Sequence, residues 1–155
     1  MGDHIYVIVK EPIAYEHHGI YVGNNVVVHF INSLIKSSLE SFADSKVVRI
    51  APNRYTYTGY EQYNFFNLLT TNVTKRYSPK EVKMRALSKL GTGVYHLEDY
   101  NGEHFASWCK CGAYCSKMVL NYDLKRFASL VLGFDTMNMD TDRSFNEKKG
   151  ELARV

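Results

Sequence analysis

Hydrophobic positions in the first third of the chain fall into short runs that favour β-strands. The runs are rich in β-branched and aromatic residues and comprise His4–Val9, Gly19–Val22, Val26–Phe30 and Lys46–Ile50. The second and third runs are separated by Gly23–Asn25, residues that readily adopt the positive φ angles of a tight turn. We therefore expect an antiparallel hairpin from Gly19 to Phe30.

A helix is predicted to begin at Ser78, which can cap it, with Pro79 at its first position and Glu81 three residues after the cap. The apolar residues that follow recur on one helical face: Val82, Ala86, Leu87 and Leu90. Gly91 can provide a left-handed C-cap. A second helix is expected over Gly102–Lys110, ended by Gly112, and a third from Tyr114 through Phe127.

Other segments give weaker signals. Ser33–Asp44 fits either a short helix or a loop, and Arg54–Asn72 receives no assignment.

The chain has 155 residues, 45% of them hydrophobic, which suits one core. We expect a domain over residues 1–134 and a polar tail over 135–155 that is disordered from about residue 140.

Charge and hydropathy narrow the function classes. The formal net charge is +3, and no Lys/Arg cluster is dense enough to indicate a phosphate-binding stripe. RNA binding therefore rests only on mild basicity and 12 tyrosines. No apolar run approaches the roughly 20 residues of a membrane-spanning helix, so none is expected. The polar N-terminus lacks a signal-peptide pattern, which favours the cytoplasm.

The three cysteines, Cys109, Cys111 and Cys115, lie close together in the sequence. An odd, local set without a secretory signal favours a reducing compartment. Together with His96 and His104 they suggest zinc, but C-x-C-x3-C does not match the paired C-x-x-C spacing of structural zinc sites. We expect buried free thiols and predict no metal and no cofactor.

Two histidines in the predicted hairpin are candidates for chemistry. His17 precedes the turn and His29 follows it, so antiparallel pairing can bring both side chains together on one face. In a thiol enzyme one imidazole abstracts the thiol proton and the second orients the first. The alternative is that the two rings pair with each other or with backbone for structural reasons. His18 is expected to point to the opposite face and to be exposed.

The start of the second helix is the other candidate. A thiol at a helix N-terminus has a lowered pKa, and the free amides there stabilise an oxyanion. However, the residue after Asn101 is Gly102, which has no side chain. Glu103 and His104 are expected to be structural, capping the helix or bonding the preceding loop.

Four ordered pieces of sequence carry a resemblance to a known family. They are Gly2-Asp3-His4-Ile5, His17-His18-Gly19-Ile20-Tyr21-Val22-Gly23, Val28-His29-Phe30 and Asn101-x-Glu103-His104-Phe105. Together they resemble the lecithin:retinol acyltransferase-like (LRAT) thiol enzymes, which include small phospholipid acyltransferases and phospholipases and the His-box/NC 2A proteins of some picornaviruses. The resemblance covers residues 2 to about 118. It implies an α+β, permuted papain-like (NlpC-type) fold, with an antiparallel sheet packed against helices.

The resemblance also implies roles for single residues. His17 resembles the general base, His29 the orienting imidazole, and Gly102 occupies the position of the nucleophilic cysteine. Supporting positions are Tyr21, Asn101, Glu103 and His104. Cys109 lies seven residues further on, about 10 Å along a helix, whereas nucleophile and base must approach to about 3 Å. We therefore expect none of the three thiols to replace the missing one.

These observations predict a catalytically silent interaction or regulatory module on the LRAT fold, such as a viral 2A-type pseudoenzyme located in the host cytoplasm. The alternative is a true acyltransferase or phospholipase A in which Gly102 is an engineered or variant residue. RNA binding is a third hypothesis. The silent module requires an unidentified protein partner, and peripheral contact with phospholipid is an additional hypothesis. Many cellular relatives have a membrane-anchoring C-terminal helix, and no such helix is expected from this sequence.

Overall fold

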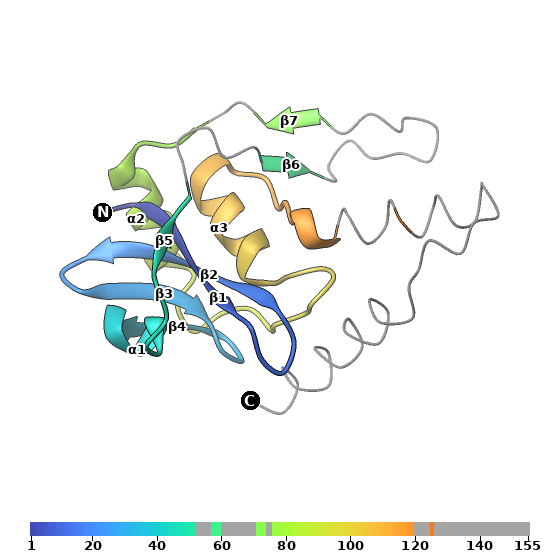
Figure 1. Ribbon diagram of the computed structural model, residues 1–155. Coiled ribbons are helices and arrows are strands. Elements are labelled where there is room, and N and C mark those ends of the chain that lie inside the picture. The colour runs from blue at the N-terminus through green and yellow to red at the C-terminus, as the bar shows by residue number, and fades with distance from the viewer. Residues whose placement is uncertain (52–56, 60–70, 74–75, 120–124, 126–155) are drawn as a thin grey trace.

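A five-stranded antiparallel sheet with the strand order β4-β3-β2-β1-β5 organises the structure (Figure 1). The computed structural model describes residues 1–51, 57–59, 71–73, 76–119 and 125. The strands of this sheet are β1 (Asp3–Val9), β2 (Tyr15–Gly23), β3 (Val26–Phe30), β4 (Leu34–Ser38) and β5 (Arg49–Ile50). Two further strands, β6 (Tyr57–Gly59) and β7 (Thr71–Val73), form a separate antiparallel pair.

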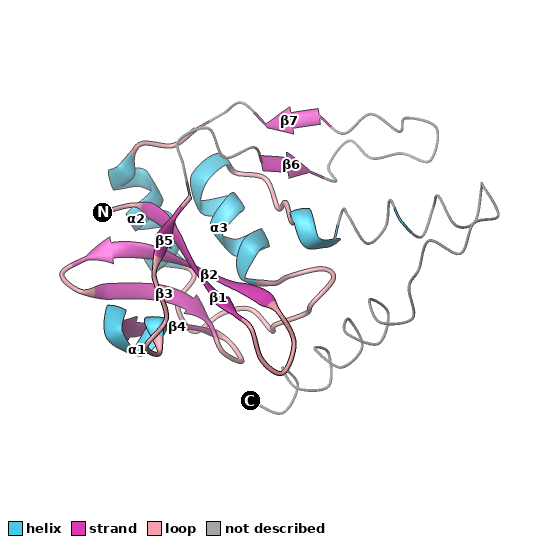
Figure 2. Cartoon of the chain, in the orientation of Figure 1, coloured by secondary structure: helices cyan, strands magenta, loops and turns pink. Residues whose placement is uncertain are grey.

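Both faces of the sheet are covered, because the side chains of each strand alternate between two apolar clusters. On one face, Ile20 and Val28 pack with Val82 of α2 (Pro79–Ser88) and Phe105 of α3 (Gly102–Cys111). On the other face, Val7 and Val27 pack with Phe42 of the short helix α1 (Leu39–Ala43). Figure 2 shows α2 and α3 on one side of the sheet and α1 on the other. The α+β class and the antiparallel sheet packed against helices are therefore as predicted.

The predicted hairpin is present and is longer than expected, because β2 begins at Tyr15. The turn residues take the left-handed conformation that the sequence suggested, with φ angles of 93° at Gly23, 52° at Asn24 and 62° at Asn25. The predicted strand His4–Val9 is also confirmed, as β1.

Two expectations for the segment after the hairpin were incomplete. Ser33–Asp44 was expected to be a short helix or a loop, yet Leu34–Ser38 forms a strand and Leu39–Ala43 the helix that follows it. The strand forms because it pairs with β3, from Val26↔Ser38 to Phe30↔Leu34. The predicted strand Lys46–Ile50 is reduced to Arg49–Ile50, which pairs with only two residues of β1.

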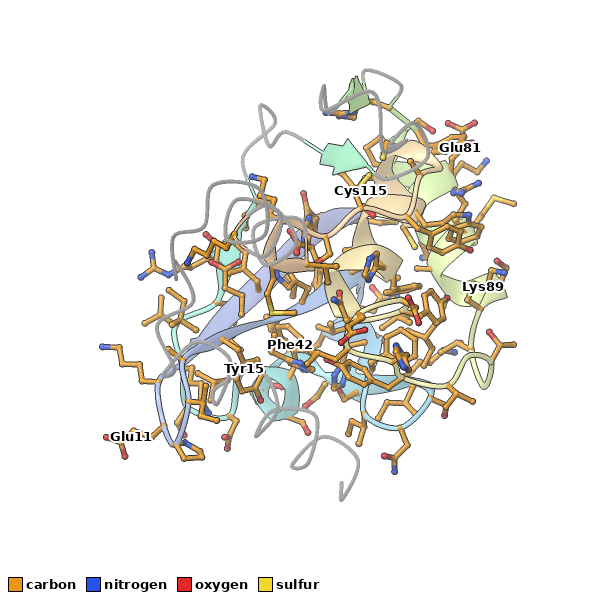
Figure 3. The ribbon with its side chains drawn as sticks, turned by 90° about the vertical axis from the view of Figure 1, so that its right-hand side faces the viewer. Glu11, Tyr15, Phe42, Glu81, Lys89 and Cys115 are labelled. Carbon is orange, nitrogen blue, oxygen red and sulfur yellow. The ribbon has the colours of Figure 1, made fainter. Side chains whose placement is uncertain are left out.

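The helix α2 begins as predicted, with a reciprocal capping box between Ser78 and Glu81. It ends at Ser88 with Lys89 as its C-cap, so Gly91 is not the cap that was expected. Gly91 instead adopts a φ angle of 71° in the following turn, where its amide donates to the carbonyl oxygen of Leu34. Glu81 and Lys89, near the two ends of this helix, are labelled in Figure 3.

The helix α3 runs from Gly102 to Cys111 and ends at Gly112, whose φ angle is 84°. Of the third predicted helix, residues 114–116 are not helical, whereas residues 117–119 and 125 are. The rest of that helix, the polar tail, the boundary near residue 134 and most of Arg54–Asn72 lie outside the described residues. Over the described ranges, the structure has no helix whose length and apolarity would let it cross a membrane.

Candidate functional site

The two hairpin histidines lie together, as the sequence predicted. The Nε2 atom of His17 is 2.9 Å from the Nδ1 atom of His29, and the Nε2 atom of His29 is 2.6 Å from the Oγ atom of Ser37 on β4. Phe42 of α1, labelled in Figure 3, stacks on the ring of His17 at a centroid distance of 5.1 Å. The pair therefore belongs to the face of the sheet that α1 covers.

Burial makes both of these rings weakly basic. It lowers the pKa of His17 to about 3, with a further contribution from the nearby His29, and lowers the pKa of His29 to about 4. Both imidazoles are therefore neutral at pH 7, and each can donate through only one ring nitrogen. A neutral imidazole pair can relay a proton but does not supply a positive charge.

His18 was expected to be exposed, and this expectation was wrong. Its side chain does point to the face opposite His17, but α3 covers that face and leaves His18 only 4% exposed. Its Nδ1 atom lies 2.8 Å from the Nε2 atom of His4 on β1, and its Nε2 atom lies 3.4 Å from a carboxylate oxygen of Glu16. A second buried imidazole pair therefore occupies the other face.

Gly102 is the first residue of α3 and lies against the backbone of β2 beside His18. A Cβ atom at position 102 would stand 3.1 Å from the carbonyl oxygen of His18 and 3.5 Å from its Cβ atom. The pairing between β2 and β3 begins only at Gly19↔His29, so the helix start meets β2 in a stretch without a β3 partner. Because 3.1 Å is shorter than an ordinary van der Waals contact, a side chain at position 102 would need the backbone of β2 at His18 to move by a few tenths of an ångström.

The residues around Gly102 hold the start of the helix, and His104 caps it as predicted, whereas the side chain of Glu103 bonds to Ser116, beyond the end of the helix, and not to the preceding loop. The Oδ1 atom of Asn101 accepts from the backbone amides of both residues, at 2.9 and 3.1 Å. The Nδ1 atom of His104 accepts from the backbone amide of Asn101, and burial lowers the pKa of His104 to about 4. The carboxylate of Glu103 accepts from the hydroxyl of Ser116 at 2.8 Å.

A cavity of about 510 Å³ opens at this helix start. Gly102, Asn101, Glu103, His17 and His18 line it, together with Glu16, Tyr15 (labelled in Figure 3), Ala14, Phe30, Ile31, Tyr95, Leu97, Lys117 and Met118. The cavity thus brings together four of the predicted site positions. His29 lies outside this lining and borders a second cavity of about 910 Å³, which His17 also lines. Tyr21, a predicted supporting residue, packs against the α1-side cluster, and its hydroxyl accepts from the amide of Asn25.

The three cysteines are buried free thiols, as predicted. Cys109 lies in the core between the sheet and the two helices, where burial raises its pKa far above the usual value. A thiol in that state is neither ionised nor accessible to a substrate in the cavity. Among the residues that the structure describes, no group of His, Cys, Asp or Glu side chains could hold a metal ion.

The family assignment rests on a match over most of the chain. The sequence model of the family described as lecithin retinol acyltransferase matches residues 1–115. The chain belongs to the lecithin retinol acyltransferase family. The match includes the hairpin histidines, Gly102 and the whole of α3. A comparison with curated proteins gave no significant match.

Within this lecithin retinol acyltransferase domain, sequence reasoning missed the partners of the histidines. Ser37 could not be placed because its strand was not predicted. Glu16 lies two residues before His18 on β2, and His4 lies two residues before Tyr6, the β1 residue that pairs with His18. Because side chains alternate between the two faces along each strand, His4 and Glu16 share a face with His18. This alternation was visible in the sequence, but it indicates a buried histidine pair only when both faces of the sheet are known to be covered.

Proposed function

We propose that this chain is a catalytically silent module of the lecithin retinol acyltransferase fold that acts by binding rather than by acyl transfer. The observation that carries the proposal is Gly102, which stands at the first position of α3 beside a cavity lined by His17 and His18. A thiol acyltransferase needs a nucleophile at this point to form the acyl-enzyme. Glycine offers none.

The other thiols of the chain support the proposal because they are poorly placed to compensate. Cys109, Cys111 and Cys115 are all buried, and Cys109 is packed among Phe105, Ala106 and other apolar residues. Its raised pKa removes the thiolate that attack on an ester requires. The three reduced thiols also support the proposed location in the reducing cytoplasm.

The surroundings of Gly102 support a retained binding site. Asn101 still caps α3, Glu103 and His104 are still hydrogen-bonded, and the cavity has polar and aromatic walls. Such a pocket can hold a ligand or a segment of a partner protein without transforming it. A 2A-type viral regulatory protein is one source of such a module.

The test restores the nucleophile and asks whether chemistry returns. The natural chain, Gly102→Cys and the matched control Gly102→Ala are incubated with phosphatidylcholine vesicles or with a p-nitrophenyl ester and analysed by intact mass. Attack by the introduced thiol on the ester carbonyl would form a thioester and release the alcohol, and hydroxylamine would cleave that thioester. We expect no adduct on the natural chain or on Gly102→Ala.

The outcomes separate the alternatives. Turnover or acylation by the natural chain would refute the silent-module proposal. An adduct on Gly102→Cys alone would support it and show that the nucleophile is the only missing part. No adduct on any of the three proteins would also support a binding role, in a pocket that has lost more than its thiol. RNA binding would instead be revealed by an affinity that falls steeply with salt.

A further inference from the structure

The start of α3 contains the only Asn-Gly pair of the chain, Asn101-Gly102. In such a pair the backbone nitrogen of the glycine can attack the side-chain amide carbon of the asparagine, because no Cβ atom obstructs its approach. The bond from this nitrogen to Cγ forms, the bond from Cγ to Nδ2 breaks, and ammonia leaves with the proton of the glycine amide. Water then opens the resulting succinimide at either carbonyl, which yields aspartate or, with an extra methylene group in the backbone, isoaspartate.

Four hydrogen bonds hold the side-chain amide of Asn101 away from this reaction. Its Oδ1 atom accepts from the backbone amides of Glu103 and His104, at 2.9 and 3.1 Å. Its Nδ2 atom donates to the carbonyl oxygen of Leu97 at 2.8 Å and to the hydroxyl of Ser116 at 3.3 Å. With both ends of the amide engaged, its Cγ atom cannot turn onto the next backbone nitrogen until the cap opens.

Burial and packing restrict the same peptide. Asn101 is 4% exposed, so water has little access to the amide proton that the reaction must remove. Gly102 is packed against β2, where a Cβ atom at position 102 would stand 3.1 Å from the carbonyl oxygen of His18. The folded chain therefore suppresses ring closure, and a chain in which the start of α3 has opened permits it.

The hydrogen-bond network has no place for the product. The hydroxyl of Ser116 accepts from Nδ2 of Asn101 and donates to the carboxylate of Glu103 at 2.8 Å. An aspartate at position 101 cannot donate, so the carbonyl oxygen of Leu97 loses this donor and two carboxylates meet at one hydroxyl. Both positions are buried, where like charges are costly. Isoaspartate lengthens the backbone and so displaces the side chain from the amides that it caps.

We propose that Asn101-Gly102 is a site of spontaneous deamidation, which the folded chain suppresses and which is modified irreversibly once the start of α3 has opened. Modification places a new negative charge in the wall of the cavity that Asn101, Gly102 and Glu103 line. The site uses the residues as they stand in this chain, and it exists because position 102 is a glycine. It does not depend on whether the chain is catalytically silent.

The test compares two asparagines in one sample. The natural chain is kept at pH 8 with and without urea, and digestion followed by mass spectrometry gives the deamidated fractions of Asn101 and Asn32. Asn32, an exposed residue between β3 and β4 that is followed by a serine, is the reference, so the ratio of the two rates removes the effect of urea on the chemistry. We expect the ratio of Asn101 to Asn32 to be at least about tenfold higher in urea, since only the unfolded chain lacks the cap. Equal ratios in the two conditions would overturn the proposal.

Gly102→Ala is the control for the chemistry. In urea, where packing no longer acts, this substitution should slow the deamidation of Asn101 several-fold, because the added Cβ atom obstructs ring closure. The rate at Asn32 should stay the same. Equal rates at Asn101 in the two proteins would show that the glycine does not create the site.

The effect of the modification on stability is measured with Asn101→Asp. Asparagine and aspartate are equivalent at an ordinary helix cap, so capping alone predicts equal stability. Because of the contacts with Leu97 and Ser116, we expect the unfolding equilibrium constant at pH 8 to be at least about tenfold higher in Asn101→Asp. Equal stability would overturn the conclusion that the fold cannot accommodate the product. A variant that fails to fold would agree with this loss, and the rates in the natural chain test the site independently. None of these readouts uses an ester, so their failure is distinct from failure of the acylation test above.

Discussion

His17 and His29 form a buried imidazole–imidazole hydrogen bond of 2.9 Å across the β2–β3 hairpin. Neither ring has a carboxylate partner in this contact, and burial is the main reason why the pKa falls to about 3 for His17 and to about 4 for His29. His104, at the start of α3, has a pKa of about 4 for the same reason. The native chain thus holds several histidines in the neutral form.

We predict that acid destabilises the fold between pH 6.5 and pH 4. The unfolded chain protonates these histidines near pH 6.5, whereas the folded chain does so only near pH 4 or below. The unfolded state therefore binds more protons in this window, and the stability present above pH 6.5 is lost as the pH falls. Each proton taken up in full contributes a slope of about 1.4 kcal/mol per pH unit. Urea unfolding at pH 7, 6, 5 and 4 measures how the free energy of unfolding falls across this window.

The matched variant for this prediction is His17→Gln, which removes one titrating ring. Its free energy of unfolding should be lower at pH 7, but its dependence on pH should be flatter than that of the natural chain. Parallel curves for the two proteins would show that His17 is not protonated differently in the folded and unfolded states.

Local signals made part of this structure predictable from the sequence. The Gly23–Asn25 turn and the Ser78 capping box each depend on residues within a few positions, and both are present. The strand Leu34–Ser38 was missed because its alternation is short and its stability comes from pairing with β3. The burial of His18 was missed because it depends on α3, more than 80 residues further along the chain, covering that face.

The cap of α3 should contribute more to stability than the cap of α2. Asn101→Ala removes the acceptor for two helix amides and two donated hydrogen bonds, to the carbonyl oxygen of Leu97 and the hydroxyl of Ser116, all of them buried. We expect a loss of about 2–4 kcal/mol, because buried groups are left without partners. Ser78→Ala, at an exposed cap, should cost about 1 kcal/mol. Urea unfolding of the two variants compares these losses of stability, and equal losses for Asn101→Ala and Ser78→Ala would contradict the expectation.

Gly19 is required by close packing of the hairpin against α1. A Cβ atom at this position would lie 2.8 Å from a methyl group of Val27 and 3.0 Å from the ring of Phe42. Gly19→Ala should therefore destabilise the fold by about 1–3 kcal/mol. The double variant Gly19→Ala/Val27→Ala removes the nearest contact and should recover part of the overpacking cost in a double-mutant cycle. Additive losses would show that Val27 is not the source of the strain.

The natural thiols should be inert in the folded chain. Cys109, Cys111 and Cys115 are at most 3% exposed, and the pKa of Cys109 is strongly raised by burial. Iodoacetamide at pH 8 should therefore add no label within the time that labels an exposed thiol, and it should add three labels in urea. Gly102→Cys should gain a single label under native conditions. Labelling of the natural chain without denaturant would contradict the burial of this cluster.

Arg85 should anchor α2 to α3 through the only tryptophan of the chain, Trp108. Its guanidinium lies 3.8 Å from the centre of the indole ring and 4.2 Å from that of Tyr77, and it donates from both Nε and Nη2 to the carbonyl oxygen of Trp108. Arg85→Ala should cost about 1–2 kcal/mol, since it removes the cation–π contacts and the charged hydrogen bonds together. It should also change the fluorescence of Trp108.

The matched control is Lys89, whose Nζ atom is 4.8 Å from the same indole ring. Lys89→Ala should cost less than about 0.5 kcal/mol. Equal effects of the two substitutions would mean that the general positive charge, and not the stacked guanidinium, joins the two helices.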